Sequence, residues 1–238
     1  MLAIVYLSCL SAKLTKGYCA PLLACPKKLP LAWLEIPRSS CTSQKVMLAS
    51  IDNISWHDHG KTHLNCCSEE PNDRLKYAVV RHPYTRLLSM YNHHHFCDSA
   101  RFEFCKRKLS TQNLNDFFQW TATTFNRIKG DRFDRTRHLR TQLSYFYDER
   151  MKSPYNISDF LILNMETIEK DFLTLEDKLC ETYGRCNVHL NLTIVNKLNA
   201  SGTHDLSLLR SNKTVLGIIN QHFAVDFTVF GYKPFSTI

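Results

Sequence analysis

The chain has 238 residues and 44% of them are hydrophobic, so it is long enough for one large domain with a substantial core and too apolar for a disordered protein. Its formal net charge of +8 favours anionic partners: nucleotides, nucleic acid, acidic glycans or a membrane surface. Only seven glycines are present, which excludes glycine-rich loops as the carriers of the chemistry.

The first 30 residues are expected to precede the main domain, as an apolar segment followed by a linker. Residues 2–10 are apolar but far shorter than the ~20 residues of a membrane span. They fit a short signal-peptide core or the remnant of a longer N-terminus, and membrane anchoring at this end is left open. Residues 13–30 carry three prolines and four lysines without strong periodicity, which is typical of a linker.

Residues 31–45, LAWLEIPRSSCTSQK, predict a buried strand over 31–36, a polar loop over 37–43 and then a helix. Thr42 or Ser43 is the expected helix cap, and the expected inward face consists of Val46, Met47, Ser50 and Ile51. A strand, a tight loop and a helix N-terminus place several backbone N–H groups at one point. Such a point binds phosphate-like anions, because the unpaired amides and the helix dipole both favour negative charge.

Residues 77–91, YAVVRHPYTRLLSMY, repeat the arrangement with a strand over 77–80 and a helix from Pro83. Residues 52–74 between the two units read as a long loop or a short helix. A third strand is predicted over 159–163, followed by a helix with apolar residues at helical spacing over 168–179. A final helix is predicted over 215–223, before an aromatic closing segment at 226–232.

Strands followed by helices, three times over, indicate an α/β fold with a mainly parallel sheet, and we expect one domain over 31–238. Such folds bind ligands at the carboxyl ends of their strands, where both anion-binding stretches lie. Cys180 and Cys186 flank a glycine-containing turn and can close a small disulfide loop. No two of the ten cysteines form a CxxC pair, so no zinc module and no metal site are predicted.

Five N-x-S/T sequons in a cysteine-rich chain indicate the secretory pathway, where sequons are used and disulfides persist. The sequons begin at Asn53, Asn156, Asn191, Asn199 and Asn212. These secretory features argue against nucleic acid as a partner.

The sequence resembles Golgi carbohydrate sulfotransferases, and within them the chondroitin and dermatan 4-O-sulfotransferases. PRSSCTSQK at 37–45 is similar to their 5′-phosphosulfate loop, PK-x-x-C-T-N-W-K, and VRHPYTRLLSMY at 80–91 to their 3′-phosphate motif, V-R-E/D-P-F/Y-x-R-L-V/L-S-x-Y. His138-Leu139 resembles a His-Trp pair, Met165-Glu166-Thr167 a Tyr-Glu-Thr segment, and HFAVDFTVFGY the closing D-F-x-x-F-x-Y. The resemblance spans about 31–235 and implies a P-loop-like three-layer fold, its central, mainly parallel sheet flanked by helices.

The resemblance implies sulfuryl transfer from 3′-phosphoadenosine 5′-phosphosulfate (PAPS) to a sugar hydroxyl of a glycan, either glycosaminoglycan-like or an N- or O-glycan. An acidic glycan is the expected acceptor, in the Golgi lumen, at its membrane or after secretion. Arg81 and Ser89 would hold the 3′-phosphate, and the basic run at 127–140 would help to hold the glycan. The 5′ end would be held by Pro37, Arg38, Ser39, Ser40, Cys41, Thr42 and Ser43.

For catalysis, Arg38 stands where the family has a lysine that faces the bridging oxygen, and Lys45 matches the second loop lysine. Arginine stays charged but is a poor proton donor. His138 is the favoured base, because histidine titrates near neutrality. Related heparan 2-O-sulfotransferases, which place a histidine between the two donor motifs, make His57, His59 and His63 its rivals, and Glu166 can organise the site.

Arg38, Gln44 and Leu139 depart from the family pattern, which leaves open a catalytically inactive, secreted glycan-binding protein on the same fold. A P-loop kinase using ATP is disfavoured, because the loop lacks G-x-x-x-x-G-K-S/T and no aspartate for magnesium is evident.

Overall fold

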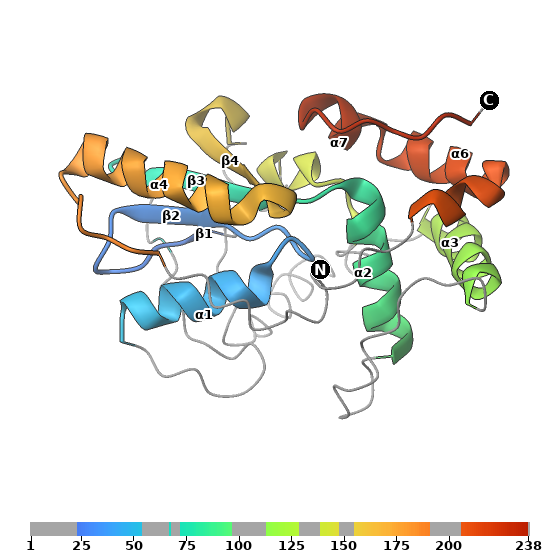
Figure 1. The fold of residues 1–238 in the computed structure, drawn as a ribbon, viewed down its shortest axis with the longest axis horizontal. Helices are drawn as coiled ribbons and strands as arrows, with labels where there is room; N and C mark the ends of the chain where they lie inside the picture. Colours follow the sequence, from blue (N-terminus) through green and yellow to red (C-terminus); the bar gives the residue numbers. More distant parts are fainter. Residues whose placement is uncertain are drawn as a thin grey trace, which may run out of the picture.

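The computed structural model describes residues 23–53, 67, 72–96, 113–128, 139–147, 155–190 and 206–237. A four-stranded sheet lies at its centre, with the order β1-β2-β3-β4 (Figure 1). β1 is antiparallel to β2, whereas β2, β3 and β4 are parallel, so the predicted α/β class and mainly parallel sheet are confirmed. The strands are Leu23–Ala24 (β1), Leu31–Leu34 (β2), Leu75–Val80 (β3) and Phe160–Asn164 (β4).

Each parallel strand leads into a helix, as predicted: β2 into α1, β3 into α2, and β4 through the 3-10 turn η5 into α4. The helices are Cys41–Ile51 (α1), Pro83–Phe96 (α2), Leu114–Ile128 (α3), Ile168–Tyr183 (α4), Lys213–His222 (α6) and Ala224–Val229 (α7). Shorter 3-10 turns are Leu143–Tyr147 (η3), Ile157–Asp159 (η4), Met165–Thr167 (η5) and Leu206–Ser211 (η6). The closing segment at 226–232 therefore begins inside a helix.

The predicted start of α1 is wrong. Ser40, not Thr42 or Ser43, occupies the N-cap position, and its side chain forms no capping hydrogen bond. The helix begins early because Ser40 adopts a left-handed conformation that turns the chain straight into it. The buried face shifts accordingly, to Ser43, Gln44, Met47, Leu48 and Ala49.

The linker predicted over 13–30 needs a related correction at its end. Leu23 and Ala24 pair with Leu34 and Trp33 of β2, so this part of the segment belongs to the sheet. Both residues are buried. This pairing depends on β2, which follows later in the chain, so no local pattern in residues 23–24 signals it.

Side chains of the sheet alternate between two faces. Leu31, Trp33, Tyr77 and Val79 face one side, where α1 and α4 cover them (Figure 1). Ala32, Leu34, Ala78 and Val80 face the other side and pack against η3 and Tyr155. Because a 3-10 turn covers this second face within the described ranges, the P-loop-like three-layer arrangement of helices stays a prediction.

A second hydrophobic core lies beside the sheet, among α2, α3, α6 and α7 (Figure 1). Leu87 of α2, Phe117 of α3, Ile219 of α6 and Phe227 of α7 belong to it. This core fixes the position of α2, and with it the residues that join α2 to β3.

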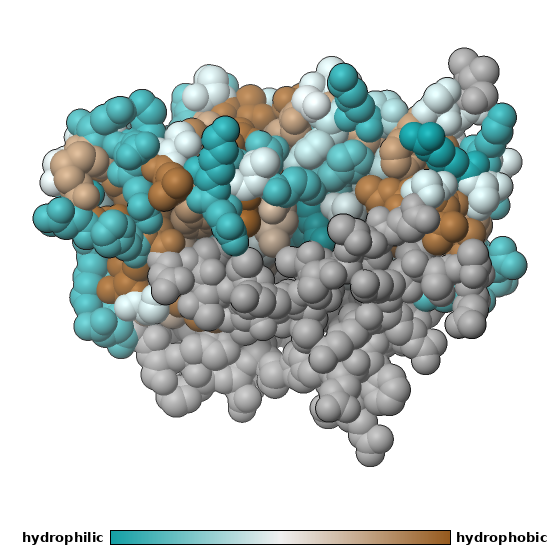
Figure 2. Space-filling model, viewed as in Figure 1, coloured by the Kyte–Doolittle hydropathy of each residue, from teal (hydrophilic) through white to brown (hydrophobic). Residues whose placement is uncertain are grey.

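Two disulfides brace the described chain, Cys25–Cys67 and Cys180–Cys186, and the second confirms the loop predicted from the sequence. Hydrophilic and hydrophobic side chains are interspersed over the part of the surface coloured in Figure 2. Within the described ranges, no helix is both long and apolar enough to cross a membrane.

Candidate anion-binding site

Three strand-to-helix connections meet at one edge of the sheet. Because β2, β3 and β4 are parallel neighbours, their carboxyl ends lie side by side. Residues 35–40 follow β2, Arg81 and His82 follow β3, and residues 165–167 follow β4. The structure thus brings together the two stretches in which the sequence predicts anion binding.

The loop after β2 presents unpaired backbone donors. Arg38 and Ser40 have φ values of 69° and 63°, a left-handed conformation that costs a residue other than glycine on the order of 1–3 kcal/mol. The N–H groups of residues 40–43 have no acceptor among the described residues. No acidic residue occupies the first turn of α1. The loop and the helix N-terminus together offer a set of unpaired donors that suits an anion.

Several side chains of this loop hold its shape. The Ser39 hydroxyl donates to Oε1 of Gln142 at 3.0 Å, and the Ser40 hydroxyl accepts from Nε2 of Gln44 at 3.3 Å. The Cys41 thiol donates to the carbonyl of Ile36 at 2.9 Å, and burial raises the pKa of this thiol to about 11, so that it stays protonated at neutral pH. These three side chains therefore form hydrogen bonds within the protein. Thr42 and Ser43, which the sequence also assigned to the 5′ end, are half-buried and buried, respectively.

Arg38 lies within the loop, and the charges of Arg86 and Arg81 act on it from the segment that follows β3. Arg86 is fully buried and donates from Nε to the carbonyl of Pro37 at 3.0 Å and from Nη1 to that of Arg140 at 2.7 Å. Burial is the main cause that lowers the pKa of Arg38 to about 10, and the charges of Arg86 and Arg81 lower it further. Arg86 belongs to the motif at 80–91, but the sequence assigned it no role; the structure shows that it anchors the loop.

Arg81 carries a buried charge without an ion-pair partner in the described part of the chain. It is 8% exposed, and its guanidinium donates from Nε to the Thr85 hydroxyl at 3.1 Å and from Nη1 to the Arg38 carbonyl at 3.5 Å. Burial lowers the pKa of Arg81, Glu166 opposes this shift, and Arg86 adds to it. The Glu166 charge acts on Arg81 without forming an ion pair, so part of the cost of burying this cation is left for an anionic ligand to offset.

Ser89 lies on the same face of α2 as Thr85, because the two residues are four positions apart in one helix. Its side chain is 6% exposed. The Nε contact to Thr85 places the Arg81 guanidinium at the base of this face. The two residues that the sequence assigned to the 3′-phosphate are therefore arranged along one helix face.

Gln142 joins the two connections, and the sequence did not indicate it. Its Oε1 accepts from the Ser39 hydroxyl at 3.0 Å and from the Arg81 N–H at 2.8 Å, and its Nε2 donates to the Arg81 carbonyl at 2.8 Å. Asp226 in turn accepts from the backbone N–H groups of Gln142 at 2.7 Å and Leu143 at 3.0 Å. Gln142 and Asp226 are both fully buried, so they fix the spacing between the ends of β2 and β3.

Glu166 organises the ends of β3 and β4. Its carboxylate accepts from the His82 N–H at 2.8 Å, the Thr85 hydroxyl at 3.3 Å and the Tyr232 hydroxyl at 3.0 Å. The His82 ring packs against Tyr84, Phe227 and Tyr232, and its Nδ1 accepts from the Tyr84 N–H at 3.3 Å. Burial lowers the pKa of His82, which favours a neutral ring in a packing role.

The remaining predicted catalytic residues differ in where they lie. Nζ of Lys45 contacts Oε1 of Glu35 at 2.9 Å, and the two side chains are 12% and 14% exposed. The loop lysine is thus paired with the acidic residue just before the loop. His138, its rivals His57, His59 and His63, and most of the basic run at 127–140 lie outside the described residues.

His222 gives the protein a testable pH dependence. A nitrogen of its ring lies 2.9 Å from the Leu139 carbonyl, the ring packs against Phe125, and burial lowers its pKa. The unfolded state therefore binds more protons in acid, so stability is lost as the pH falls below the ordinary histidine pKa of about 6.5. One such group contributes a slope of at most about 1.4 kcal/mol per pH unit.

We expect His222→Gln to flatten the fall in unfolding free energy between pH 7.5 and 5.5, measured by urea denaturation. His189→Gln is the matched control, because the His189 side chain is 90% exposed. An unchanged slope in His222→Gln would show that the ring does not lose protons on folding.

No protein-family model matches the chain, and no curated protein or solved structure is significantly similar to it. Within the described ranges, no three His, Cys, Asp or Glu side chains converge as metal ligands. The assignment of a function therefore rests on the site itself and on the motifs at 37–45 and 80–91.

Proposed function

We propose that the protein is a PAPS-dependent carbohydrate O-sulfotransferase that transfers a sulfuryl group to a sugar hydroxyl of a glycan. The observation that carries this proposal is Arg81, a buried cation with no ion pair among the described residues, beside the unpaired N–H groups of residues 40–43. Two sets of donors, the N–H groups of the loop and the Arg81 guanidinium just before α2, suit a ligand that carries two anionic groups. PAPS has this distribution of charge.

Each half of the site would hold one end of the donor. The N–H groups of residues 40–43, with Arg38 beside them, would bind the 5′-phosphosulfate. Arg81 would bind the 3′-phosphate, with Ser89 further along α2, because a guanidinium can meet two phosphate oxygens at once. Gln142 supports this assignment, since its amide connects the two halves directly.

In the reaction, the acceptor hydroxyl oxygen bonds to sulfur while the bond from sulfur to the bridging oxygen of PAPS breaks. The hydroxyl proton passes to a base, and 3′-phosphoadenosine 5′-phosphate leaves. Arg38 would stabilise the charge that develops on the bridging oxygen, because a group with a pKa of about 10 stays charged at pH 7. His138 is proposed as the base. Glu166 would position the His82 backbone and Thr85, whose hydroxyl accepts from Nε of Arg81.

The parallel strands with anion-binding connections at their carboxyl ends support a P-loop-like fold. The two disulfides support an oxidising compartment, and we propose the Golgi lumen, its membrane or secretion. An acidic glycan is the proposed acceptor, since the chain is basic.

One observation favours a second candidate, a glycan-binding protein without activity. Lys45, which would assist catalysis, is paired with Glu35, and Arg38 replaces the other loop lysine. Loss of both proton-donating lysines from the reaction would leave a site that binds PAPS but transfers nothing.

The test is to measure the binding of PAPS, 3′-phosphoadenosine 5′-phosphate and ATP by calorimetry, and then sulfate transfer to a panel of glycans. We expect PAPS and 3′-phosphoadenosine 5′-phosphate to bind at least tenfold more tightly than ATP, because only they carry a 3′-phosphate for Arg81. Tighter binding of ATP would contradict the proposal and favour the kinase. PAPS binding without transfer to any acceptor would favour the inactive protein.

A further inference from the structure

We propose a second anion-binding site, a basic cleft that binds a segment of an acidic glycan chain at the edge of the sheet opposite the donor site. The cleft has a volume of about 260 Å³ and is lined by residues that include Lys27, Lys28, Asp73, Arg74, Tyr183 and Arg185. Arg74 immediately precedes β3 and Tyr183 ends α4. The cleft thus lies beyond the amino ends of the parallel strands, whereas Arg81 lies at their carboxyl ends.

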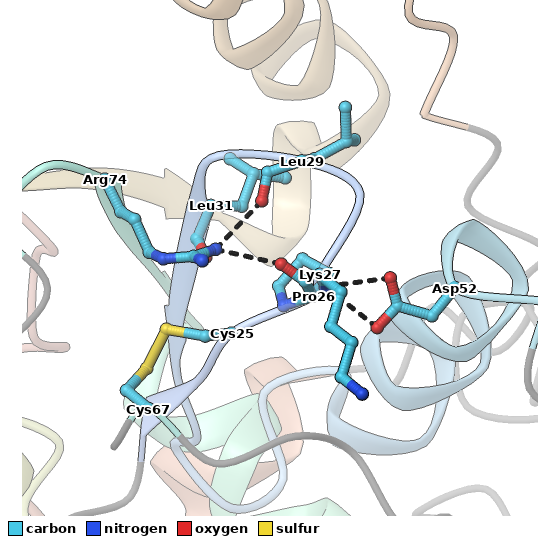
Figure 3. Close-up of a disulfide and its surroundings, with 8 residues drawn as sticks. All are labelled: Cys25, Pro26, Lys27, Leu29, Leu31, Asp52, Cys67 and Arg74. Atoms are coloured by element: carbon cyan, nitrogen blue, oxygen red, sulfur yellow. Dashed lines mark hydrogen bonds between the residues drawn. A yellow bond between two sulfur atoms is a disulfide. The ribbon is translucent and has the colours of Figure 1, made fainter. Parts of the chain in front are cut away.

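One wall of the cleft is a braced turn (Figure 3). The Asp52 carboxylate accepts from the Lys27 N–H at 2.9 and 3.0 Å and from the Lys28 N–H at 3.1 Å. Nη1 of Arg74 donates to the carbonyl of Pro26 at 2.9 Å and to that of Leu29 at 3.0 Å. The disulfide Cys25–Cys67 anchors the start of the same turn to a distant part of the chain.

These contacts fix the backbone of the turn and do not involve the ammonium groups of the two lysines. Lys27 and Lys28 are exposed, and neither forms an ion pair with a described residue. Two adjacent cations on a rigid turn lose little conformational freedom in their backbone when they bind an anion. Arg74 has a structural role in this turn as well as lining the cleft.

The opposite wall is also rigid. Gly184 ends α4 in a left-handed conformation with a φ of 65°, and the N–H of Arg185 donates to the Leu179 carbonyl at 3.3 Å. The disulfide Cys180–Cys186 encloses this turn. Arg185 is exposed there next to the half-buried ring of Tyr183, which gives a flat apolar surface beside a charge.

The charges and the compartment identify the ligand class. Four cationic residues and one carboxylate line the cleft, so it attracts polyanions. Disulfides persist in oxidising compartments, where acidic glycans rather than nucleic acids are the expected polyanions. A tyrosine ring between cations suits a ligand whose apolar sugar faces alternate with sulfate or carboxylate groups.

The test measures the binding of a heparin-derived octasaccharide to the full chain by calorimetry at 50 and 150 mM NaCl. The triple variant Lys27→Ser, Lys28→Ser, Arg185→Ser keeps Arg74, whose bonds hold the turn. We expect it to bind at least about tenfold more weakly, which corresponds to the loss of three exposed charge contacts. The matched control removes three exposed lysines elsewhere, with Lys170→Ser, Lys213→Ser and Lys233→Ser, and should change the affinity less than about threefold.

Equal losses of affinity in the two triple variants would show that the net positive charge of the protein, and not the cleft, binds the octasaccharide. Failure of the native chain to bind the octasaccharide would also overturn the proposal. A single-stranded oligodeoxynucleotide of equal charge and vesicles containing phosphatidylserine are the remaining arms. Binding of either as tight as that of the octasaccharide would overturn the assignment to a glycan. PAPS binding should be the same in the cleft variant and the native chain, so failure of the cleft and failure of the proposed donor site are separable.

Discussion

Replacing Arg81 with methionine is expected to weaken the binding of PAPS by about 10- to 150-fold, because hydrogen bonds to a charged group contribute ~1.5–3 kcal/mol. Methionine keeps much of the bulk and removes the charge. Without ligand, we expect the same variant to be as stable as the native chain or more stable, since it removes a buried cation that has no ion pair among the described residues. Calorimetry with PAPS and thermal unfolding of the free protein measure the two effects.

The opposite signs of these effects separate a ligand-binding arginine from a structural one. Arg81→Lys should bind PAPS with intermediate affinity, because an ammonium group keeps the charge but cannot meet two phosphate oxygens in a fork. Arg185→Met, at the opposite edge of the sheet, is the matched control and should leave PAPS binding unchanged. Native affinity in Arg81→Met, or a large loss of stability without ligand, would remove Arg81 from the proposed site.

The secondary structure around the site could be predicted because its signals are local. Short apolar runs followed by polar loops and helix-forming segments indicated β2, β3 and β4 and the helices after them. Parallel pairing then placed the loop after β2 beside Arg81 without further information. The two anion-binding stretches thus lie side by side because each follows a strand and the two strands are parallel neighbours.

The start of α1 could not be predicted for a conformational reason. Serine and threonine are common helix caps, which favoured Thr42 or Ser43. The structure instead places Arg38 and Ser40 in left-handed conformations, which residues other than glycine adopt rarely. No residue in PRSSCTSQK signals these left-handed conformations. They determine which backbone N–H groups face the site.

The polar connections of the site could not be predicted because they join distant residues. Gln142 contacts Ser39 across 103 positions, and Asp226 contacts Gln142 across 84. A glutamine between basic and aromatic residues has no periodicity that marks it as buried. Asp226 was visible only as the first residue of the closing D-F-x-x-F-x-Y similarity, to which no role was assigned. The pairing of Lys45 with Glu35 likewise depends on the turn between them.

Replacing Asp226 with alanine is expected to lower the free energy of unfolding by about 3–5 kcal/mol, a large part of the 5–15 kcal/mol typical of a domain. The carboxylate is fully buried and accepts two backbone N–H groups. Burial lowers the pKa of Arg86, and the charge of this carboxylate, after that of Tyr145, opposes the shift. Alanine would leave the two buried N–H donors without an acceptor and would remove one of the negative charges that favour the charged form of Arg86. Equilibrium denaturation in guanidinium chloride measures the change.

Asp226→Asn tests the same network with less change of shape. An amide oxygen can accept one of the two N–H groups, but the amide NH₂ then faces the other, so we expect an intermediate loss of stability. Asp177→Asn, on the exposed face of α4, is the control and should change the free energy by less than about 0.5 kcal/mol. Because Asp226 holds Gln142, and Gln142 holds both Ser39 and Arg81, the Asn variant should also bind PAPS more weakly while still folded. Native stability in Asp226→Ala would contradict this network, and native PAPS affinity in a destabilised Asp226→Asn would separate the network from the donor site.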